Sequence, residues 1–167
     1  MAIFICGFMG CGKSTFLKEL ERNSSKGELI DLDDLIYETY KEDDESLGHL
    51  IEREGFAQFR IYEAQLIRIL MKRGNDTVVA LGGGAMGQIS ASQFLENNCP
   101  LVFLDIDFET CWRRVISDAT RRPLVLEGKK SNKKRFEMRR CEYQKSALTL
   151  KGVLPSSIEE LQRKLLQ

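Results

Sequence analysis

Short runs of apolar residues recur along this chain and predict β-strands. The runs cover residues 2–6, 28–31, 77–81, 101–105 and 147–150. Strands of this length that are apolar at consecutive positions are typical of sheets buried on both faces. We therefore expect five short strands in the interior of the protein.

Between these runs, apolar residues recur at the spacing of α-helices. The pattern predicts helices over residues 14–21, 35–73, 108–117 and 133–146. The long second segment is expected to break near residues 43–46 and at Gly55.

Two further segments follow from local sequence signals. Serines at 156–157 precede glutamates at 159–160, a combination typical of a helix start, and predict a last helix that reaches Leu166. Residues 118–132 are polar and basic without a helical period, and predict a mobile loop.

The alternation of strands and helices predicts an α/β fold with three layers. In such folds a parallel sheet is covered by helices on both sides. A chain of 167 residues has the length of one ordinary domain, so residues 1–167 are expected to share one core. Ligands bind such sheets at the carboxyl ends of the strands, which is where candidate chemistry is expected.

Composition excludes several classes of protein. Lys plus Arg and Asp plus Glu both total 25, so no net charge favours nucleic acid or a membrane surface. No apolar run approaches the roughly 18 residues that span a bilayer. Five cysteines without a C-x-x-C pair argue against a disulfide scaffold or a zinc site. We expect a reduced, cytoplasmic protein without nucleic-acid or membrane partners.

The strongest motif follows the first predicted strand. Residues 7–14 fit G-x-x-x-x-G-K-[ST], a phosphate-binding loop (P-loop), and lie between a predicted strand and a predicted helix. Its glycines let backbone N–H groups surround phosphate oxygens, and the helix N-terminus adds its positive dipole end. Lys13 would reach the β- and γ-phosphates, and Ser14 would bind Mg²⁺. The motif predicts a nucleotide site but not the reaction.

Acidic residues end the second and fourth predicted strands. Asp31 and Asp33 are two positions apart, so an extended chain would project both carboxylates toward the ligand edge. One carboxylate near Mg²⁺ and one near an attacking hydroxyl suit phosphoryl transfer. The alternative is that these residues, with Asp34, cap a helix beginning at Leu35. Asp105 is either a Walker B aspartate or, the interpretation we favour, a cap for the next helix.

Charged residues and glycines recur at useful spacings in the middle of the chain. Arg60 and Glu63 are three positions apart on a predicted helix. They form either a solvated surface pair or a preorganised ligand for a carboxylate. Gly82, Gly83 and Gly84 follow an apolar strand directly, which favours close approach of a ligand to the backbone.

A basic segment occupies the last third of the chain. Arg121 and Arg122 lie in the predicted loop, where a mobile arm could close over phosphates. Arg135, Arg139 and Tyr143 share one face of the following predicted helix. The many basic residues here could instead form a solvated face or a nucleic-acid patch. The balanced net charge and the lack of an aromatic platform disfavour nucleic acid.

These residues, in this order, resemble the shikimate kinases over essentially the whole chain. The matching positions are residues 7–15, Asp31-Leu32-Asp33, Gly55, Phe59-Arg60, Glu63, Gly82-Gly83-Gly84, Arg122-Pro123-Leu124, Arg139 and Tyr143. The resemblance implies phosphorylation of the 3-hydroxyl of shikimate by ATP with Mg²⁺, a step toward chorismate. It also implies a monomeric P-loop kinase domain like the nucleoside monophosphate kinases, with a parallel sheet in the order 2-3-1-4-5.

The resemblance also implies roles for particular residues. For catalysis these are Lys13, Asp33 and Arg122, with Asp33 orienting or deprotonating the attacking hydroxyl and Arg122 on a lid over residues 118–132. For ATP they are Gly10, Cys11, Gly12, Lys13, Ser14, Thr15, Arg114, Arg122 and Pro155, with Arg114 and Pro155 beside adenine. For shikimate they are Asp33, Arg60, Gly82, Gly83, Gly84 and Arg139, with a substrate-binding helical segment over 33–62. For Mg²⁺ they are Ser14 directly and Asp31 through water.

The sequence departs from the family pattern in two places. Phe56 stands where many members have Glu, and Arg139-Arg140-Cys141 lacks a common proline, so Arg140 could compete with Arg139 for the substrate. Three alternatives stay open: a P-loop kinase for gluconate or a nucleotide, a non-catalytic ATP-binding module, and a relative that has lost shikimate. A pair of arginines beside three glycines favours a carboxylate substrate.

Overall fold

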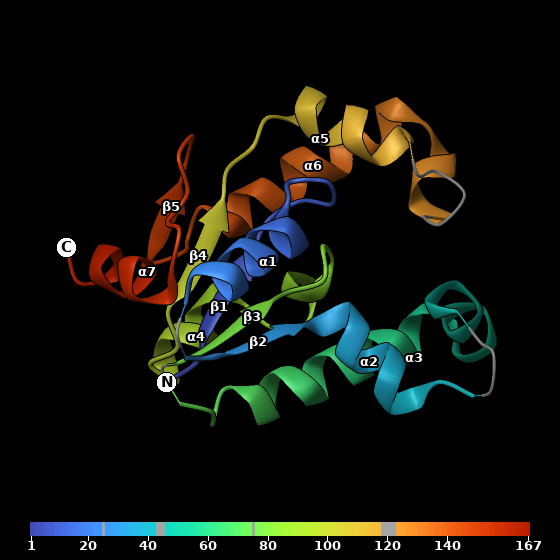
Figure 1. The fold of residues 1–167 in the computed structure, drawn as a ribbon. Coiled ribbons are helices and arrows are strands. Elements are labelled where there is room, and N and C mark those ends of the chain that lie inside the picture. The colour runs from blue at the N-terminus through green and yellow to red at the C-terminus, as the bar shows by residue number, and fades with distance from the viewer. Residues whose placement is uncertain (25, 43–45, 75, 118–122) are drawn as a thin grey trace.

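Five parallel strands form the centre of the computed structural model, which describes residues 1–24, 26–42, 46–74, 76–117 and 123–167. The strands are β1 (Ile3–Cys6), β2 (Glu28–Asp31), β3 (Thr77–Ala80), β4 (Leu101–Leu104) and β5 (Leu148–Leu150). They lie in the order β2-β3-β1-β4-β5, and each neighbouring pair is parallel (Figure 1). The predicted strands, the α/β class and the strand order are confirmed.

The centre of the sheet is its most apolar part. All four residues of β1, β3 and β4 are buried, as expected for parallel strands covered on both faces. In the central strand, Ile5 lies opposite Ala80 of β3 and Val102 of β4. Because these strands are in register, the loops that follow them begin side by side.

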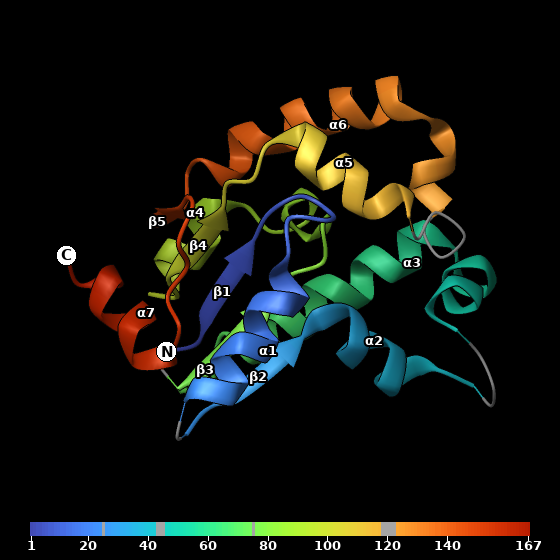
Figure 2. The same cartoon turned by 45° about the horizontal axis from the view of Figure 1, so that its top comes forward.

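Helices cover both faces of this sheet. They are α1 (Lys13–Asn23), α2 (Leu32–Tyr40), α3 (Leu47–Leu70), α4 (Ala91–Glu96), α5 (Phe108–Ile116), α6 (Lys129–Tyr143) and α7 (Ile158–Leu165). Figures 1 and 2 show α1 and α7 on one face and α3 and α4 on the other, so the three-layer prediction is confirmed. In the described part of the chain, no helix is both long and apolar enough to cross a membrane.

The predicted start of the last helix and both predicted breaks of the second helical segment are confirmed. Ser157 caps α7, its side chain accepting a hydrogen bond from the backbone N–H of Glu160. The second predicted segment divides into α2 and α3, and α3 is itself kinked at Gly55, where φ is 82°. The short α4 was not predicted, because six residues are too few to show a helical period.

The start of α2 differs from the prediction. Asp31 is the N-cap, because its side chain accepts a hydrogen bond of 3.1 Å from the backbone N–H of Asp33. Asp34 lies in the first turn and does not cap the helix. The helix therefore begins at Leu32 and not at Leu35, and the prediction of an extended chain between the two aspartates is wrong.

The loop predicted over residues 118–132 is helical in its described part. Residues 123–127 form a short 3₁₀ helix, and α6 begins at Lys129. The buried side-chain amide of Asn132 donates hydrogen bonds to the carbonyl oxygen of Gly128 at 2.9 Å and to the 3₁₀ helix at 2.8 Å. The loop prediction is wrong here because these polar contacts replace the missing apolar period. Residues at the start of the predicted loop lie outside the described chain.

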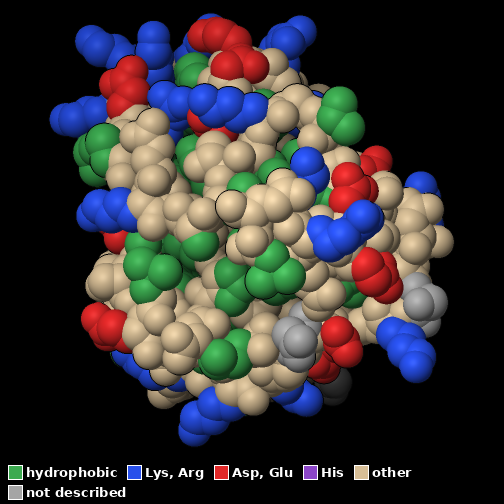
Figure 3. Space-filling view, turned by 90° about the vertical axis from the view of Figure 1, so that its left-hand side faces the viewer, with side chains coloured by type: hydrophobic (Ala, Val, Ile, Leu, Met, Phe, Trp, Pro, Cys, Tyr) green, Lys and Arg blue, Asp and Glu red, His purple; other side chains and the backbone are tan. Residues whose placement is uncertain are grey.

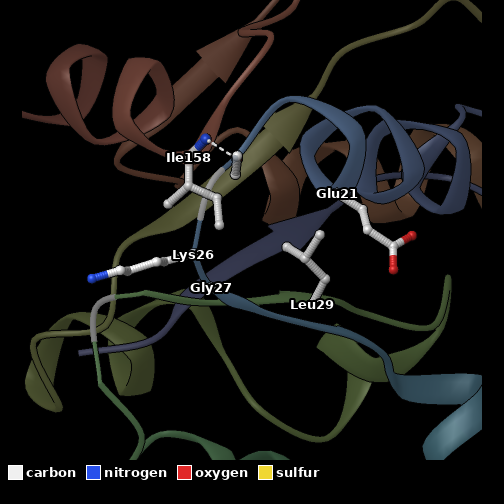
Figure 4. A pocket seen from close by; sticks show the side chains of 6 residues that line it. Glu21, Lys26, Gly27, Leu29 and Ile158 are labelled. Atoms are coloured by element: carbon white, nitrogen blue, oxygen red, sulfur yellow. Dashed lines mark hydrogen bonds between the residues drawn. The ribbon is translucent and has the colours of Figure 1, made fainter.

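The amino-terminal edge of the sheet holds a pocket where α7 packs beside β2 (Figure 4). The backbone N–H of Ile158 donates to Ser24 Oγ at 2.9 Å. Gly27 has a φ of +138°, and a Cβ there would collide with the Ile158 side chain, so the close packing requires glycine. Glu21 and Lys26 line the pocket but point away from one another (Figure 4). The pocket therefore brings no reactive groups together.

Candidate active site

Three segments that carry the predicted chemistry meet at the carboxyl edge of the sheet. The P-loop, residues 7–14, follows β1, Asp31 ends β2, and the triple glycine 82–84 follows β3 closely. Since β2, β3 and β1 are neighbours, these segments are adjacent although they are far apart in the sequence. The strand order thus assembles one site, at the edge where such sheets bind ligands.

The P-loop takes its shape from its glycines. Gly10 and Gly12 have φ of +79° and +100°, a region that other L-residues rarely adopt. A Cβ on Gly10 would also lie 2.6 Å from the carbonyl oxygen of Cys111, so the loop packs directly against α5. Gly12 is the N-cap of α1 and places the free N–H groups of that helix at the loop. This backbone geometry favours an anion.

Two cations lie on the P-loop. Lys13 Nζ donates to the carbonyl oxygens of Gly7 at 2.9 Å and Phe8 at 3.2 Å. Arg114, on α5, donates from Nη1 to the carbonyl oxygen of Gly10 at 3.2 Å. The structure therefore brings two of the three predicted nucleotide-binding cations, Lys13 and Arg114, to the loop. Phosphate oxygens, being charged, would be stronger acceptors than these carbonyls.

An oxygen pair suited to Mg²⁺ lies beside the loop. Ser14 Oγ donates to Asp31 Oδ2 at 2.6 Å. Among the described residues, no group of three or more His, Cys, Asp and Glu side chains could hold a metal ion. Mg²⁺ prefers oxygen ligands and commonly takes only one or two from the protein, with phosphates and waters completing its shell. This hydroxyl and carboxylate therefore fit a Mg²⁺ ion carried by a nucleotide.

Two carboxylates converge where the triple glycine begins. A Cβ on Gly82 would lie 2.6 Å from Asp33 Oδ1 and 2.6 Å from Glu63 Oε1, so only glycine leaves room for both. Glu63 is fully buried, and its Oε1 has no hydrogen-bond partner among the described residues. Burial, with a contribution from Asp31, raises the pKa of Asp33 to about 6. Burial also raises the pKa of Glu63 to about 7, against the opposing effect of Arg60.

Two arginines lie at the other two glycines. Arg60 forms an ion pair with Glu63, and its guanidinium carbon would lie 2.6 Å from a Cβ on Gly84. Arg139, on α6, has its Nη1 3.8 Å from the position of a Cβ on Gly83. Burial lowers the pKa of Arg139, although an arginine stays protonated. Because Glu63 is buried, the interpretation of its pair with Arg60 as a solvated surface contact is wrong.

The predicted shared face of α6 divides into two regions. The buried Tyr143 donates from its hydroxyl to the carbonyl oxygen of Gly83 at 2.7 Å, on the same side as Arg139. Arg135 is bound near the start of the helix, where it donates to Asn132 Oδ1 at 3.0 Å and Glu127 Oε2 at 2.7 Å. Only the second half of α6 therefore faces the triple glycine.

Arg140 is directed away from the site. Its Nε and Nη2 donate to the two carboxylate oxygens of Asp105 at 3.1 and 2.8 Å, and Lys151 Nζ lies 3.2 Å from the same carboxylate. Of the two neighbouring arginines, it is thus Arg139, the one that the family resemblance assigns to shikimate, that approaches the triple glycine.

Asp105 has neither of its two expected roles. The cap of α5 is Asp107, whose Oδ1 accepts from the backbone N–H of Thr110 at 2.8 Å. The carboxylate of Asp105 is instead neutralised by two cations, which argues against the Walker B interpretation.

Over the residues that it describes, the structure shows no contact that tests the predicted roles of the remaining residues. Cys11 is buried in the P-loop, and Thr15 is exposed on α1. Pro155 is buried in the segment between β5 and α7, so its contact with adenine stays a prediction. Arg122 lies outside the described residues, and its place over the phosphates also stays a prediction. Phe56 follows the kink in α3 and is 45% exposed.

Sequence reasoning missed the burial of Glu63 beside Asp33. A signal was present, because Phe59 and Leu66 flank Glu63 at helical spacing and are both buried. A glutamate inside an apolar stripe is a candidate for a buried functional carboxylate. The pair of Arg140 and Asp105 had no comparable signal, because it joins residues far apart in the sequence.

The arrangement can bind two different ligands side by side. The P-loop and Lys13 suit phosphates, whereas Arg60 and Arg139 suit a carboxylate. Asp33 interacts electrostatically with both Lys13 and Arg60, and so lies between the two regions. Such a site can transfer a phosphoryl group to a hydroxyl of a small carboxylate-bearing molecule, because this reaction depends mainly on positioning and charge neutralisation.

Comparisons with known protein sequences point to one family. The shikimate kinase family model matches residues 9–167. The shikimate kinase of Lactococcus lactis subsp. lactis (strain IL1403) is 34% identical over 162 residues, covering 96% of this chain and 93% of that protein. The shikimate kinase of Aquifex aeolicus (strain VF5) is 33% identical over 155 residues, covering 93% and 89% respectively.

Solved structures agree with the sequence comparisons. The shikimate kinase from Acinetobacter baumannii in complex with shikimate has a TM-score of 0.79 at 26% identity, covering 99% of this chain and 90% of that one. The crystal structure of shikimate kinase from Aquifex aeolicus has a TM-score of 0.78 at 30% identity, covering 99% and 96%. The matches extend over nearly the whole of both chains, so this chain belongs to the shikimate kinase family.

Proposed function

We propose that this protein transfers the γ-phosphoryl group of ATP to the 3-hydroxyl of shikimate, giving shikimate 3-phosphate and ADP. The observation that carries the proposal is the meeting of Arg60 and Arg139 at the triple glycine, on the same sheet edge as the P-loop. Paired guanidinium groups match a planar carboxylate, which shikimate carries beside its hydroxyls. A nucleoside monophosphate acceptor offers no carboxylate to such a clamp.

Asp33 would orient and deprotonate the attacking hydroxyl. It lies between the arginine pair and Lys13, and its raised pKa of about 6 suits a base that works near neutral pH. In this step a bond forms between the substrate oxygen and the γ-phosphorus, and the bond from that phosphorus to the oxygen of ADP breaks. Lys13 would neutralise the charge that develops on the transferred group.

The nucleotide would occupy the P-loop. Backbone N–H groups over Gly10, Cys11, Gly12, Ser14 and Thr15 would bind its phosphates. Arg114 already contacts the loop, which supports its place beside the nucleotide, with Pro155 expected on the other side of adenine. Arg122 would close over the phosphates and exclude water.

Ser14 would bind Mg²⁺ directly, and Asp31 would bind it through water. Their hydrogen bond already brings the two oxygens together. When bound, the ion would neutralise negative charge on the β- and γ-phosphates.

We also propose that the protein is a monomer of a reduced compartment such as the cytoplasm. All five cysteines are free thiols. Figure 3 shows the side of the molecule near β5 and α7, where apolar side chains occur in small separate groups. Three of the basic residues of α6 are paired with acidic ones, which disfavours a nucleic-acid patch: Lys129 with Glu109, Arg135 with Glu127, and Arg140 with Asp105. Size-exclusion chromatography with light scattering tests the monomer.

The proposed reaction is tested by a coupled assay of ADP release with ATP and Mg²⁺. Shikimate, gluconate and nucleoside monophosphates are compared as acceptors, with the wild-type protein and with Arg60→Ala. The matched control is Arg68→Ala, which removes an exposed arginine from the same helix. We expect turnover with shikimate alone, reduced about 100-fold in kcat/KM by Arg60→Ala and unchanged by the control. Turnover with gluconate or a nucleotide in its place would overturn the proposal.

A further inference from the structure

The ion pair of Arg140 and Asp105 has no part in the proposed reaction, yet its geometry is well defined. Two parallel hydrogen bonds of 3.1 and 2.8 Å join the guanidinium to both carboxylate oxygens. The side chain of Asp105 is only 6% exposed, whereas that of Arg140 is 38% exposed. A bidentate pair fixes direction as well as distance. The pair therefore ties α6 to the end of β4 in one orientation.

The direction of Arg139 depends on the helix that carries it. Among the described residues, its guanidinium has neither an ion pair nor a hydrogen bond of its own. Successive residues of an α-helix are separated by a fixed rotation about the helix axis. Because Arg140 is the next residue, a rotation of α6 that separated Arg140 from Asp105 would also turn Arg139 away from Gly83.

Other contacts of α6 lie on both sides of Arg139. Before it, the ring of Phe136 packs against Phe8, and after it two hydrogen bonds hold the carboxyl-terminal end of the helix. Tyr143 donates to the carbonyl oxygen of Gly83 at 2.7 Å, and Glu142 Oε1 accepts from the backbone N–H of Ala91 at 3.0 Å. Both contacts lie beyond Arg139 in the direction of β5. The bond from Arg140 is the one closest in sequence to Arg139.

We propose that Asp105 and Arg140 are positioning residues that hold α6 so that Arg139 faces the triple glycine and the substrate carboxylate. The inference rests on the proposed function, because that function assigns Arg139 to the carboxylate. Neither Asp105 nor Arg140 touches the substrate in this account. Their effect is on the affinity for shikimate and not on the affinity for ATP.

The surroundings of the pair allow it to be broken without leaving an unpaired buried charge. Lys151 lies 3.2 Å from Asp105, so Arg140→Gln leaves that carboxylate with a cation. Asp105→Asn keeps the shape of the side chain, and the partly exposed Arg140 can then be hydrated. Both variants are therefore expected to fold, whereas loss of a fully buried partner is strongly destabilising.

The first test separates KM from kcat in the coupled assay. We expect Asp105→Asn and Arg140→Gln each to raise the KM for shikimate about fivefold, with kcat and the KM for ATP changed less than about twofold. Arg140→Lys should recover part of the affinity, since a lysine keeps the charge but not the bidentate geometry. Lys151→Gln is the matched control, because it removes the other cation from Asp105 without changing α6. The control should leave the KM for shikimate unchanged.

The second test is a double-mutant cycle on kcat/KM for shikimate. If Asp105 acts through Arg139, Asp105→Asn should have no further effect in an Arg139→Ala background. Equal effects of Asp105→Asn in both backgrounds would overturn the inference, as would a wild-type KM in the single variant. In those outcomes the wild-type protein still phosphorylates shikimate. A wild-type protein inactive with shikimate would instead refute the proposed function, and the inference with it.

Discussion

The two sides of the site differ in how their charges are held. On the phosphate side, a continuous loop over residues 7–14 offers backbone N–H groups and one lysine, and most of its shape comes from glycine conformations. On the substrate side, Asp33, Glu63, Arg60 and Arg139 arrive from three different helices and meet around three glycines.

This difference has a consequence for specificity. Backbone groups bind any phosphate chain of the right geometry, so the phosphate side defines a nucleotide but no acceptor. Partly buried charged side chains that lose water when a ligand binds reject a ligand that leaves them unpaired, so the substrate side discriminates among acceptors. Variants on the phosphate side should therefore preserve shikimate binding, and variants on the substrate side should preserve ATP binding.

The largest effect is expected from Lys13→Ala on the phosphate side. In the proposed reaction Lys13 stabilises the transferred group in the transition state, so we expect kcat to fall by about 10³-fold or more. Calorimetry should show shikimate binding within about twofold of wild type, because no shikimate contact is removed. Lys18→Ala, an exposed lysine on the same helix, is the control and should retain full activity. A loss of shikimate binding as large as the loss of kcat would contradict the division into two sides.

Asp33→Asn should have the next largest effect. An amide cannot accept the proton of the attacking hydroxyl, so kcat should fall about 100-fold while the dissociation constant for ATP stays unchanged. Asp34→Asn is a matched control, because Asp34 is the same residue type, adjacent in sequence and exposed. Steady-state kinetics and nucleotide titration measure both quantities. Full activity of Asp33→Asn would show that this residue does not act as the base.

Gly82→Ala tests whether the two carboxylates need the space that glycine leaves. The new Cβ would lie 2.6 Å from an oxygen of both Asp33 and Glu63, so one carboxylate must move. We expect kcat/KM for shikimate to fall about tenfold, with the KM for ATP unchanged. Gly87→Ala is the control, since a Cβ there meets nothing within 4 Å. Equal kinetics for the two variants would mean that the carboxylates do not define the substrate side.

The smallest expected effect is a change in how the free energy of unfolding depends on pH, caused by the titration of Glu63. Its pKa is raised from 4.5 to about 7 in the folded protein, so the folded state binds more protons between these values than the unfolded state does. The contribution of Glu63 to the free energy of unfolding therefore decreases as pH rises through this window. Glu63→Gln does not titrate, whereas Asp33 titrates in both proteins.

Urea unfolding of wild type and Glu63→Gln at two pH values measures this contribution. Between about pH 5 and about pH 8, the stability of the variant relative to wild type should rise by on the order of 1 kcal/mol. A relative stability that falls over the same range would show that the ion pair with Arg60 dominates and that the pKa of Glu63 is lowered.

The phosphate side could be predicted from sequence because its determinants are contiguous. One eight-residue motif between a strand and a helix specifies the loop, its lysine and the serine beside Asp31. On the substrate side, Arg60, Glu63 and the triple glycine could be named, but their meeting depends on the strand order, which came from the resemblance to a family. The burial of Glu63 depends on the packing of α3 and was therefore missed.

Other features escaped prediction for specific physical reasons. The first turn of α6 is stabilised by the side-chain amide of Asn132, which leaves no apolar period to detect. The early start of α2 depends on the hydrogen bond that the Asp31 carboxylate accepts from the backbone N–H of Asp33, and any of three aspartates could have been the cap. The bond between Arg140 and Asp105 joins two elements through tertiary packing, and a single sequence holds no record of such pairs.

The most direct test of the central claim is the identity of the phosphorylated atom. The product formed from ATP, Mg²⁺ and shikimate by the wild-type protein is examined by a phosphorus–proton correlation spectrum. The account predicts one new phosphorus signal coupled to the proton on carbon 3 of the ring. A signal coupled to another ring proton, or ADP formed without a shikimate phosphate, would contradict it.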